Sequence, residues 1–385
     1  MANKTIVIIR NAAPQDFGGG ERFPVFLAEI LQSTNYTPII VSRSEKLLSF
    51  ADERKLKTIK GWWWKKQQWS GKNNALIGFY FAWQGILFIY YVFLFIHTRP
   101  QAVHIQSKDD FIAATYAAHT LRIRSIWTDH ADLKHIWKNT ALPFKNPIGK
   151  WILKAAKKTH TITVVSRNEE SLILDNFPEK PSIHNKFKVI YNGVLDVAQN
   201  YPRAADTKKL TYLIASRLVV DKGIREAIRA FKILHNDHPE NRLVIIGDGP
   251  DANMLKKQAR DCSAITFLGH QKDPLLHMAA ADVFIHPTYH EGFSVALVEA
   301  SMMNLPIIAT SVGGNKEIVE NKKTGLLVPQ QDSEALAAAM IQLHEDGQLR
   351  RKLGSAARKQ YLAKYQFNRI VKKSFIPLYD NTKER

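Results

Sequence analysis

Short apolar runs rich in Val, Ile and Leu alternate along the chain with longer segments of helical character. Runs that are apolar at nearly every position are typical of parallel strands covered by helices on both faces of the sheet. The runs fall into two series, and we expect a strand at each run. The first series is 5–9, 37–41, 102–106, 125–128, 161–165 and 187–191, and the second is 210–215, 242–246, 265–268, 283–286, 307–309 and 325–328.

Two such series predict two doubly wound α/β domains of the Rossmann-like type. The polar stretch DVAQNYPRAADTK, residues 196–208, has no periodicity and separates the two series. We therefore expect a first domain over residues 1–195 and a second over residues 196–360.

Residues of unusual chemistry follow four of the expected strands. FGGGERF, with Gly19 and Gly20, follows the first strand of the first series. In the second series SRLVVDKG, with Arg217 and Lys222, follows the first strand, GDGP, with Gly249, the second, and PTYHEGFS the fourth. Ligands of open parallel sheets bind beyond the carboxyl ends of the strands, so we expect these loops to form a binding site.

Each loop has an ordinary structural interpretation as well as a functional one. The glycine cluster is either a tight turn or a cradle of backbone N–H groups for an anion, and it does not match the dinucleotide fingerprint GxGxxG. Arg217 and Lys222 are either a solvated surface pair or a clamp on a diphosphate, in which Arg offers a planar fork and Lys a point charge.

The stretch HEGFSVALVEA, residues 290–300, carries two glutamates, Glu291 and Glu299, around an otherwise small and apolar run. Gly292 permits a tight turn, and the helix expected from Phe293 onward would offer unpaired N–H groups to phosphate oxygens. Two carboxylates also suit a glycoside hydrolase, with an acid and a nucleophile. A hydrolase has no need of a diphosphate clamp, whereas transfer from a nucleotide sugar uses both features, and the sequence favours transfer.

Composition excludes some kinds of site. The chain has 385 residues, 45% of them hydrophobic, which is enough for the cores of two domains. The single cysteine, Cys262, excludes an intrachain disulfide and a cysteine zinc cluster and suits a reducing cytoplasm. The start, MANKTIVIIRN, is read as a strand and not as a signal peptide. His286 and His290 have helical ligand spacing, but Pro287 opposes a helix there, so we expect no metal.

The net charge of +19 is uneven, with 27 Lys and Arg against 14 Asp and Glu in residues 1–190. This excess implies an anionic partner, which could be nucleic acid, an anionic membrane surface or a phosphorylated substrate. The aromatic–basic stretch WWWKKQQW, residues 62–69, fits nucleic acid, but a nucleic-acid partner would leave Glu291, Glu299 and the glycine loops without a purpose. We therefore expect no nucleic-acid partner.

Residues 75–96 form an uncharged run of 22 residues, long enough to span a bilayer. Spanning would separate strands of one sheet, because the next strand begins at residue 102. The run could instead be a helix buried against the sheet or a helix lying in the membrane interface. The upstream stretch GWWWKKQQWSGK favours the interface.

EGFSVALVE resembles the E-x7-E element of the retaining glycosyltransferase family 4, whose members have the GT-B fold. The resemblance extends over nearly the whole chain. Its other motifs, in order, are FGGGER, VSRNE, VIYNGV, SRLVVDKG, IGDGP, HMAAADVFIHPTYHEGFSVALVEA, and TSVGGNKEIV followed by GLLVP. No single motif is specific, but their combination in this order is.

The resemblance implies a role for each matching position. Arg217 and Lys222 would bind the donor diphosphate and stabilise it as the leaving group. Glu291 would contact the transferred sugar and Glu299 the ribose hydroxyls. His130 in WTDH would lie near the sugar and acceptor, unless it is a hydrogen-bonded structural histidine. The further donor-binding positions are Gly19, Gly20, Gly249, Gly292, Phe293, Ser294 and Val295.

The resemblance also implies an activity. The chain would be a retaining hexosyltransferase with two Rossmann-like domains and a donor cleft between them, using a UDP- or GDP-linked sugar and no metal or other cofactor. The first domain would hold a lipid-linked or lipopolysaccharide-type acceptor, and residues 361–385 would return to it as a helix. The enzyme would be cytoplasmic and peripheral on the inner face of the membrane. The competing possibilities are a non-catalytic GT-B scaffold and a basic nucleic-acid-binding protein.

Overall fold

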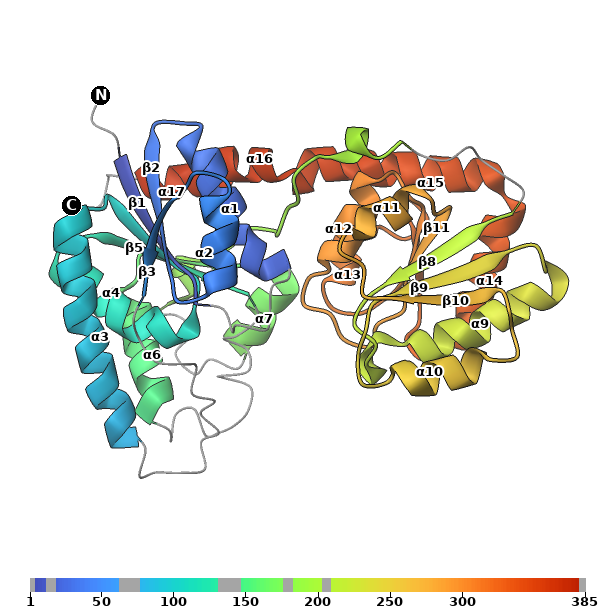
Figure 1. Ribbon diagram of the computed structural model, residues 1–385, viewed down its shortest axis with the longest axis horizontal. Helices are drawn as coiled ribbons and strands as arrows, with labels where there is room; N and C mark the ends of the chain where they lie inside the picture. The colour runs from blue at the N-terminus through green and yellow to red at the C-terminus, as the bar shows by residue number, and fades with distance from the viewer. Residues whose placement is uncertain are drawn as a thin grey trace. The chain divides into compact units, whose positions relative to one another are not determined.

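The computed structural model describes residues 4–11, 19–61, 77–130, 147–175, 183–202 and 209–380, and the chain divides into two compact units (Figure 1). Unit 1 comprises residues 1–190 and 370–385, and unit 2 comprises residues 191–369. The chain thus passes from unit 1 to unit 2 at residue 190, slightly before the expected domain boundary at 195. The C-terminal return begins at residue 370 instead of 361. The Trp and Lys residues at 62–72 lie outside the described residues.

Unit 1 is built on a seven-stranded parallel sheet with the order β3-β2-β1-β4-β5-β6-β7. Its strands are β1 (Lys4–Ile9), β2 (Tyr36–Ser42), β3 (Lys57–Lys60), β4 (Ala102–Ile105), β5 (Arg124–Asp129), β6 (Thr161–Val164) and β7 (Phe187–Val189). Its main helices are α1 (Gly19–Gln32), α2 (Glu45–Asp52), α3 (Ile77–Thr98), α4 (Phe111–Thr120), α6 (Pro147–Lys158), α7 (Arg167–Asp175) and α17 (Ile376–Asp380). The strand order reverses direction between β1 and β4.

The core of unit 1 lies between this sheet and the layer formed by α3, α4 and α6. Trp127 of β5 is completely buried and stacks on Phe111 at the start of α4, with ring centroids 4.1 Å apart. The indole N–H of Trp127 donates to Thr115 Oγ1 at 2.8 Å, so its polar atom is satisfied inside the core.

Unit 2 is built on a six-stranded parallel sheet with the order β10-β9-β8-β11-β12-β13. Its strands are β8 (Thr211–Ala215), β9 (Arg242–Ile246), β10 (Ile265–Gly269), β11 (Val283–His286), β12 (Ile307–Thr310) and β13 (Leu326–Val328). Its main helices are α9 (Ile224–Asp237), α10 (Ala252–Ala259), α11 (Pro274–Ala279), α12 (Val295–Met302), α13 (Asn315–Ile318), α14 (Ser333–Glu345), α15 (Gly347–Gln360) and α16 (Phe367–Ile370), which ends where the chain enters unit 1 again. Here the strand order reverses between β8 and β11.

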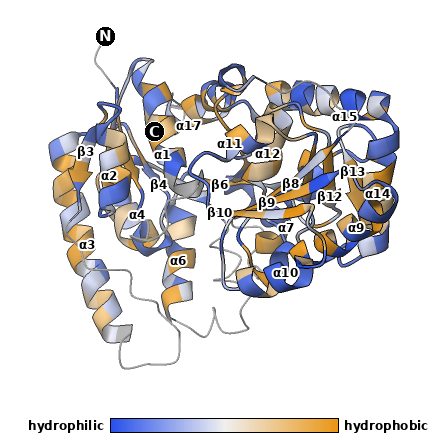
Figure 2. Ribbon diagram, turned by 45° about the vertical axis from the view of Figure 1, so that its right-hand side comes forward, coloured by the Kyte–Doolittle hydropathy of each residue, from blue (hydrophilic) through white to orange (hydrophobic). Residues whose placement is uncertain are grey.

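Helix α3 corresponds to the long uncharged run, and it is neither wholly buried nor wholly exposed. Among the described residues, α3 is the single helix that is long enough and apolar enough to cross a bilayer. One face packs on α4 and the sheet, through Leu87, Tyr91, Leu94 and Phe95. The opposite face is exposed and carries hydrophobic positions along the helix (Figure 2).

The end of the chain packs into unit 1. The Tyr379 hydroxyl lies 2.7 Å from His104 Nδ1 on β4, and Phe375 packs edge-on against Phe23 of α1 at 5.7 Å between centroids. Both Tyr379 and Phe375 are almost completely buried. The C-terminal segment is therefore part of the core of the unit in which the chain began.

Candidate functional site

The reversal of strand order in unit 2 brings two chemically unusual loops next to each other. β8 and β11 are neighbouring parallel strands, so their carboxyl ends lie at the same edge of the sheet. The loop after β8 carries Arg217 and Lys222, and the loop after β11 carries Glu291. The connections from these strands leave in opposite directions, which opens a crevice for ligands in doubly wound sheets.

Lys222 and Glu291 form an ion pair across the two loops, with Lys222 Nζ 2.7 Å from Glu291 Oε2. His286, the last residue of β11, places Nε2 3.2 Å from the same oxygen. Each side chain of the ion pair is only 18% exposed. Burial alone would raise the pKa of Glu291, but the His286 hydrogen bond and the Lys222 charge outweigh it and lower the pKa to about 2. Glu291 is therefore a carboxylate at neutral pH.

The backbone holds the two loops together around this pair. Lys222 ends the short 3₁₀ turn η5 (Val220–Lys222), and Gly223 follows with a φ of 62°. A Cβ at Gly223 would lie 2.0 Å from the carbonyl oxygen of Pro287, so a glycine is needed both for the conformation and for the close approach. The Asp221 carbonyl accepts from the Tyr289 N–H at 2.7 Å and from Thr288 Oγ1 at 2.9 Å.

Arg217 lies in the same loop as Lys222, but the structure does not pair it with the two charged side chains. Arg217 is exposed, and within the described parts of unit 2 its guanidinium makes no hydrogen bond or ion pair. A cation at a strand end without a protein partner is available to an anionic ligand. Of the two cations of the expected clamp, Lys222 is thus partly buried and paired with Glu291, and Arg217 is exposed.

The stretch around Glu291 continues into helix α12, which begins at Val295 and not at Phe293 as expected. Ser294 is the N-cap, and its Oγ accepts from the Leu297 N–H at 3.3 Å. Phe293 lies before the helix and is buried, stacked on Tyr191 at 5.6 Å between centroids. Glu299 lies in the second turn of α12 and is partly buried.

One glycine of the expected donor-binding set, Gly249, has a clear packing role, and another, Gly292, lies against a glycine that does. A Cβ at Gly249 would lie 2.3 Å from the Leu218 carbonyl oxygen, in the loop that carries Arg217. A Cβ at Gly314 would lie 2.0 Å from the Gly292 carbonyl oxygen. The loop after β11 and the loop after β12 therefore also touch through their backbones. Close backbone packing thus accounts for the glycine at 249, whereas the contact at the Gly292 carbonyl accounts for the glycine at 314.

In unit 1 the expected residues also follow strands, two of them at the reversal of strand order and His130 one strand beyond it. Gly19 and Gly20 are the first two residues of α1, which follows β1. His130 follows β5, and its ring packs edge-on against Phe23 at 5.2 Å. Neither ring nitrogen of His130 has a hydrogen-bond partner among the described residues. Burial, followed by the charge of Arg10, holds its pKa well below the usual range, so the ring is neutral.

Sequence reasoning missed two residues at these edges. Asp110, after β4, is buried and accepts from the Tyr91 hydroxyl at 2.7 Å and from Asn11 Nδ2 at 2.6 Å. Burial raises the pKa of Asp110 to about 7 despite those hydrogen bonds. His286 was considered only as a metal ligand. Its position at the end of a strand, five residues before Glu291, indicated that it lies near that carboxylate but not which way its ring faces.

Among the described residues one cluster, His238, Glu240 and His344, has side-chain atoms close enough to hold a metal ion. Asn241 decides against it. Asn241 Oδ1 accepts from the Leu210 N–H, so its NH₂ group is the one that donates to His344 Nδ1, at 3.1 Å. The proton of the neutral ring then lies on Nε2, the atom 3.5 Å from Glu240 Oε1. A ligating nitrogen must carry no proton, so the cluster is better described as a hydrogen-bonded group.

Comparison with known families gives two matches that together span most of the chain. The family model described as "Glycosyltransferase Family 4" matches residues 17–195. The family model described as "Glycosyl transferases group 1" matches residues 199–360.

Individual relatives match shorter parts. The capsular polysaccharide biosynthesis glycosyltransferase CapM of Staphylococcus aureus is 31% identical over 153 residues, which is 39% of this chain and 40% of that protein. A GDP-mannose-dependent alpha-(1-6)-phosphatidylinositol monomannoside mannosyltransferase of Mycobacterium tuberculosis is 32% identical over 42% of this chain and 46% of that protein. The chain spans about half the length of the curated relatives it matches.

Solved structures match over the full length at low identity. A glycosyltransferase from Rickettsia africae has a TM-score of 0.77 at 18% identity and covers 100% of both chains. HepE of Anabaena, solved with UDP and glucose, has a TM-score of 0.74 at 16% identity, over 97% of this chain and 99% of that one. At such identities the likeness establishes the shared fold.

Proposed function

From the premise that this chain belongs to glycosyltransferase family 4 and has the GT-B fold, we propose that it is a retaining hexosyltransferase. The donor is a nucleotide-diphosphate sugar, linked to UDP or GDP. The acceptor is a lipid-linked or lipopolysaccharide-type glycan in cell-envelope polysaccharide synthesis. Relatives named for capsular polysaccharide and for phosphatidylinositol mannosides support this class of acceptor.

The observation that carries the proposal is the ion pair of Lys222 and Glu291 at the reversal of strand order in unit 2. Because Glu291 keeps a pKa of about 2, it cannot serve as the general acid that a glycoside hydrolase needs, whose pKa must be raised. A permanent carboxylate accepts hydrogen bonds from sugar hydroxyls instead. An ionised carboxylate could also be the nucleophile of a retaining hydrolase, so it is the exposed Arg217 in the neighbouring loop, suited to a diphosphate, that favours sugar transfer over hydrolysis.

In the proposed reaction the protein chiefly stabilises the charge that develops as the donor bond breaks. Lys222, held in place by Glu291, and the exposed Arg217 stabilise the negative charge of the departing diphosphate. The first N–H groups of α12, from Val295, contact phosphate or sugar oxygens, and Glu299 accepts from the ribose hydroxyls.

Unit 1 contributes the acceptor side in this proposal. His130 is neutral and has both ring nitrogens unpartnered among the described residues, so it can donate to or accept from a sugar hydroxyl without carrying charge. Gly19 and Gly20 open α1, whose first N–H groups suit an anionic group of a ligand. No metal or other cofactor enters the scheme, and activity should persist in the presence of a chelator.

The acceptor class implies contact with a membrane, and we place the enzyme on the cytoplasmic face of one. The exposed face of α3 carries Phe79, Ile86, Ile89, Phe93 and Ile96 at helical spacing, so they form a single stripe, hereafter the α3 stripe. Phe93 is 68% exposed. An apolar stripe on a strongly basic chain suits the interface of an anionic bilayer.

A panel of nucleotide sugars tests the activity. Incubating the protein with each donor and measuring release of the nucleotide should identify one donor that is turned over, with faster release when a glycan acceptor is added. A non-catalytic scaffold would bind a donor, seen as a thermal shift, without turnover. A nucleic-acid-binding protein would shift with an oligonucleotide and with none of the donors.

A further inference from the structure

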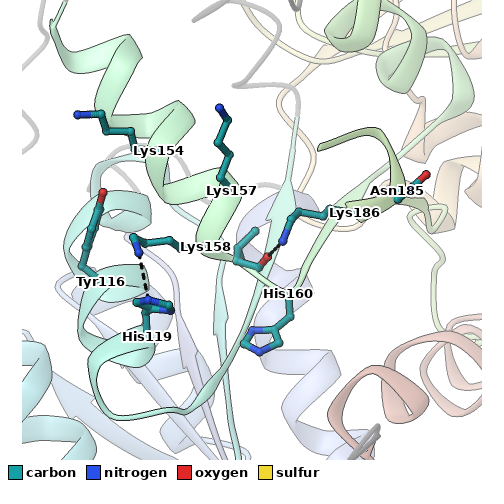
Figure 3. A pocket seen from close by; sticks show the side chains of 9 residues that line it. Tyr116, His119, Lys154, Lys157, Lys158, His160, Asn185 and Lys186 are labelled. Atoms are coloured by element: carbon teal, nitrogen blue, oxygen red, sulfur yellow. Dashed lines mark hydrogen bonds between the residues drawn. The ribbon is translucent and has the colours of Figure 1, made fainter. Parts of the chain in front are cut away.

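Unit 1 contains a basic pocket that the proposed chemistry does not use (Figure 3). Lys154, Lys157, Lys158, Lys186, His119 and His160 define it, and we call it the lysine pocket. His160 directly precedes β6, and His119 and Lys158 lie in the last turns of α4 and α6. The pocket therefore lies at the amino ends of the strands, at the sheet edge opposite His130. Its volume is about 770 Å³.

The described walls of the pocket are basic and carry no acidic side chain. None of its described lining residues is acidic, although four of them are lysines. Lys158 Nζ donates to His119 Nε2 at 3.0 Å, and Lys186 Nζ donates to the Thr159 carbonyl at 2.7 Å. Within the described residues neither Lys154 nor Lys158 pairs with a carboxylate. Ammonium groups gathered in a pocket with no acidic lining attract an anion.

Aromatic contacts connect the pocket with the apolar surface of the same unit. Tyr116 lines the pocket and lies 5.7 Å from Trp151 between ring centroids, and Trp151 lies 5.9 Å from Phe81 of α3. Trp151 is 38% exposed, and the Lys154 ammonium lies 4.8 Å from its ring. An exposed indole beside lysines is typical of the membrane–water interface.

We propose that the lysine pocket binds the phosphate of an anionic glycerophospholipid headgroup. The inference rests on the membrane contact in the proposed function and adds a specific headgroup site to it. A soluble phosphate would account for the lysines alone. A lipid also accounts for exposed Trp151 and for the α3 stripe on the neighbouring helix, which would lie against the bilayer.

Vesicle sedimentation tests the site with the full chain. The variant Lys154→Gln/Lys157→Gln removes two charges from the pocket, and the matched control Lys256→Gln/Lys257→Gln removes two from α10 in unit 2. At low salt we expect the pocket variant to bind phosphatidylglycerol vesicles about 30-fold more weakly than the wild type. The control should bind them nearly as the wild type does, and phosphatidylcholine vesicles should not distinguish the proteins.

Other outcomes would overturn the inference. Equal losses in both double variants would mean diffuse attraction and no site. Saturable binding of soluble glycerol phosphate without any preference for anionic vesicles would assign the pocket to a soluble ligand. Loss of oligonucleotide binding with unchanged vesicle binding would assign it to nucleic acid. If the wild type binds no vesicles, the membrane contact itself fails. Donor turnover is measured separately, without vesicles, and should be unchanged in the pocket variant. A failure of the headgroup site can then be distinguished from a failure of the proposed transferase activity.

Discussion

Glu291 has two charged or polar neighbours that decide its chemistry, and they come from different parts of the chain. Lys222 approaches from the loop after β8, and His286 from the end of β11. The sequence identified Lys222 and Glu291 as members of one site because both follow strands. It could not identify His286 as the partner of Glu291, because the geometry of the intervening turn decides whether that ring faces the carboxylate or turns away.

Removing either member of the ion pair should abolish most of the transferase activity. We expect Lys222→Met and Glu291→Gln each to lower kcat about 100- to 1000-fold, because each removes a charged contact that is strongest as the donor bond breaks. Rates with the donor identified in the panel, measured beside circular dichroism spectra, check this. Lys232→Met, which removes a lysine from α9, is the control. Wild-type turnover by Glu291→Gln would contradict the role of this carboxylate.

Glu291 should also make the stability of the protein depend on acid pH. Its pKa is about 2 in the folded chain and 4.5 ordinarily, so its stabilising effect is complete above pH 4.5 and is lost as the pH falls toward 2. The difference corresponds to about 3 kcal/mol of free energy of unfolding. Denaturation in urea between pH 5 and pH 2.5 should show a smaller loss for Glu291→Gln than for the wild type. Glu334→Gln, in the first turn of α14, should follow the wild type.

At the level of elements, every expected strand is present, because buried parallel strands are apolar at nearly every position. The strand that the sequence missed, β3, is the edge strand with the sequence KTIK and two exposed residues. An edge strand is held by hydrogen bonds on one side and needs little apolar character, so its pattern resembles a loop. Helix α12 was placed two residues early because Ser294 acts as the cap.

The turn after η5 should tolerate no side chain. We expect Gly223→Ala to lower the free energy of unfolding by at least about 1–3 kcal/mol, because φ is 62° and a Cβ would lie 2.0 Å from the Pro287 carbonyl oxygen. Activity should fall as well, since Lys222 is the preceding residue. Gly347→Ala is the matched control, because a Cβ there meets only flexible arginine side chains. Equal unfolding midpoints for both variants would contradict the argument.

The α3 stripe should determine binding to membranes irrespective of their charge. Phe93→Ser removes its most exposed aromatic side chain, and we expect partition into both phosphatidylcholine and phosphatidylglycerol vesicles to weaken about tenfold. Leu276→Ser removes a side chain that is 59% exposed on α11 in unit 2 and should have no effect. Unchanged binding of Phe93→Ser would mean that the stripe faces something other than lipid. This pattern differs from the headgroup-dependent loss expected for the lysine pocket.

At the scale of the whole molecule, the chain crosses between the units twice, near residues 190 and 370. The two series of strands predict the existence of two units, since each series forms its own sheet. They do not predict the exact residues at which the chain passes between the units. The segments there are not strands, and the unit to which each belongs depends on its packing. Residues 361–369 illustrate this, since Tyr365 donates its hydroxyl hydrogen to the Glu317 carbonyl at 2.6 Å and belongs to unit 2.

The C-terminal return should make the stability of unit 1 depend on the last residues of the chain. Tyr379→Ala removes a buried ring and its contact with His104, and we expect it to lower the free energy of unfolding of unit 1 by about 3–5 kcal/mol. Met340→Ala, at a completely buried position of unit 2, is the matched control. Calorimetry combined with limited proteolysis should show unit 1 cut first in Tyr379→Ala and unit 2 cut first in Met340→Ala. If both variants gave the same fragments, the two units would unfold together. The C-terminal segment would then stabilise the whole chain and not unit 1 alone.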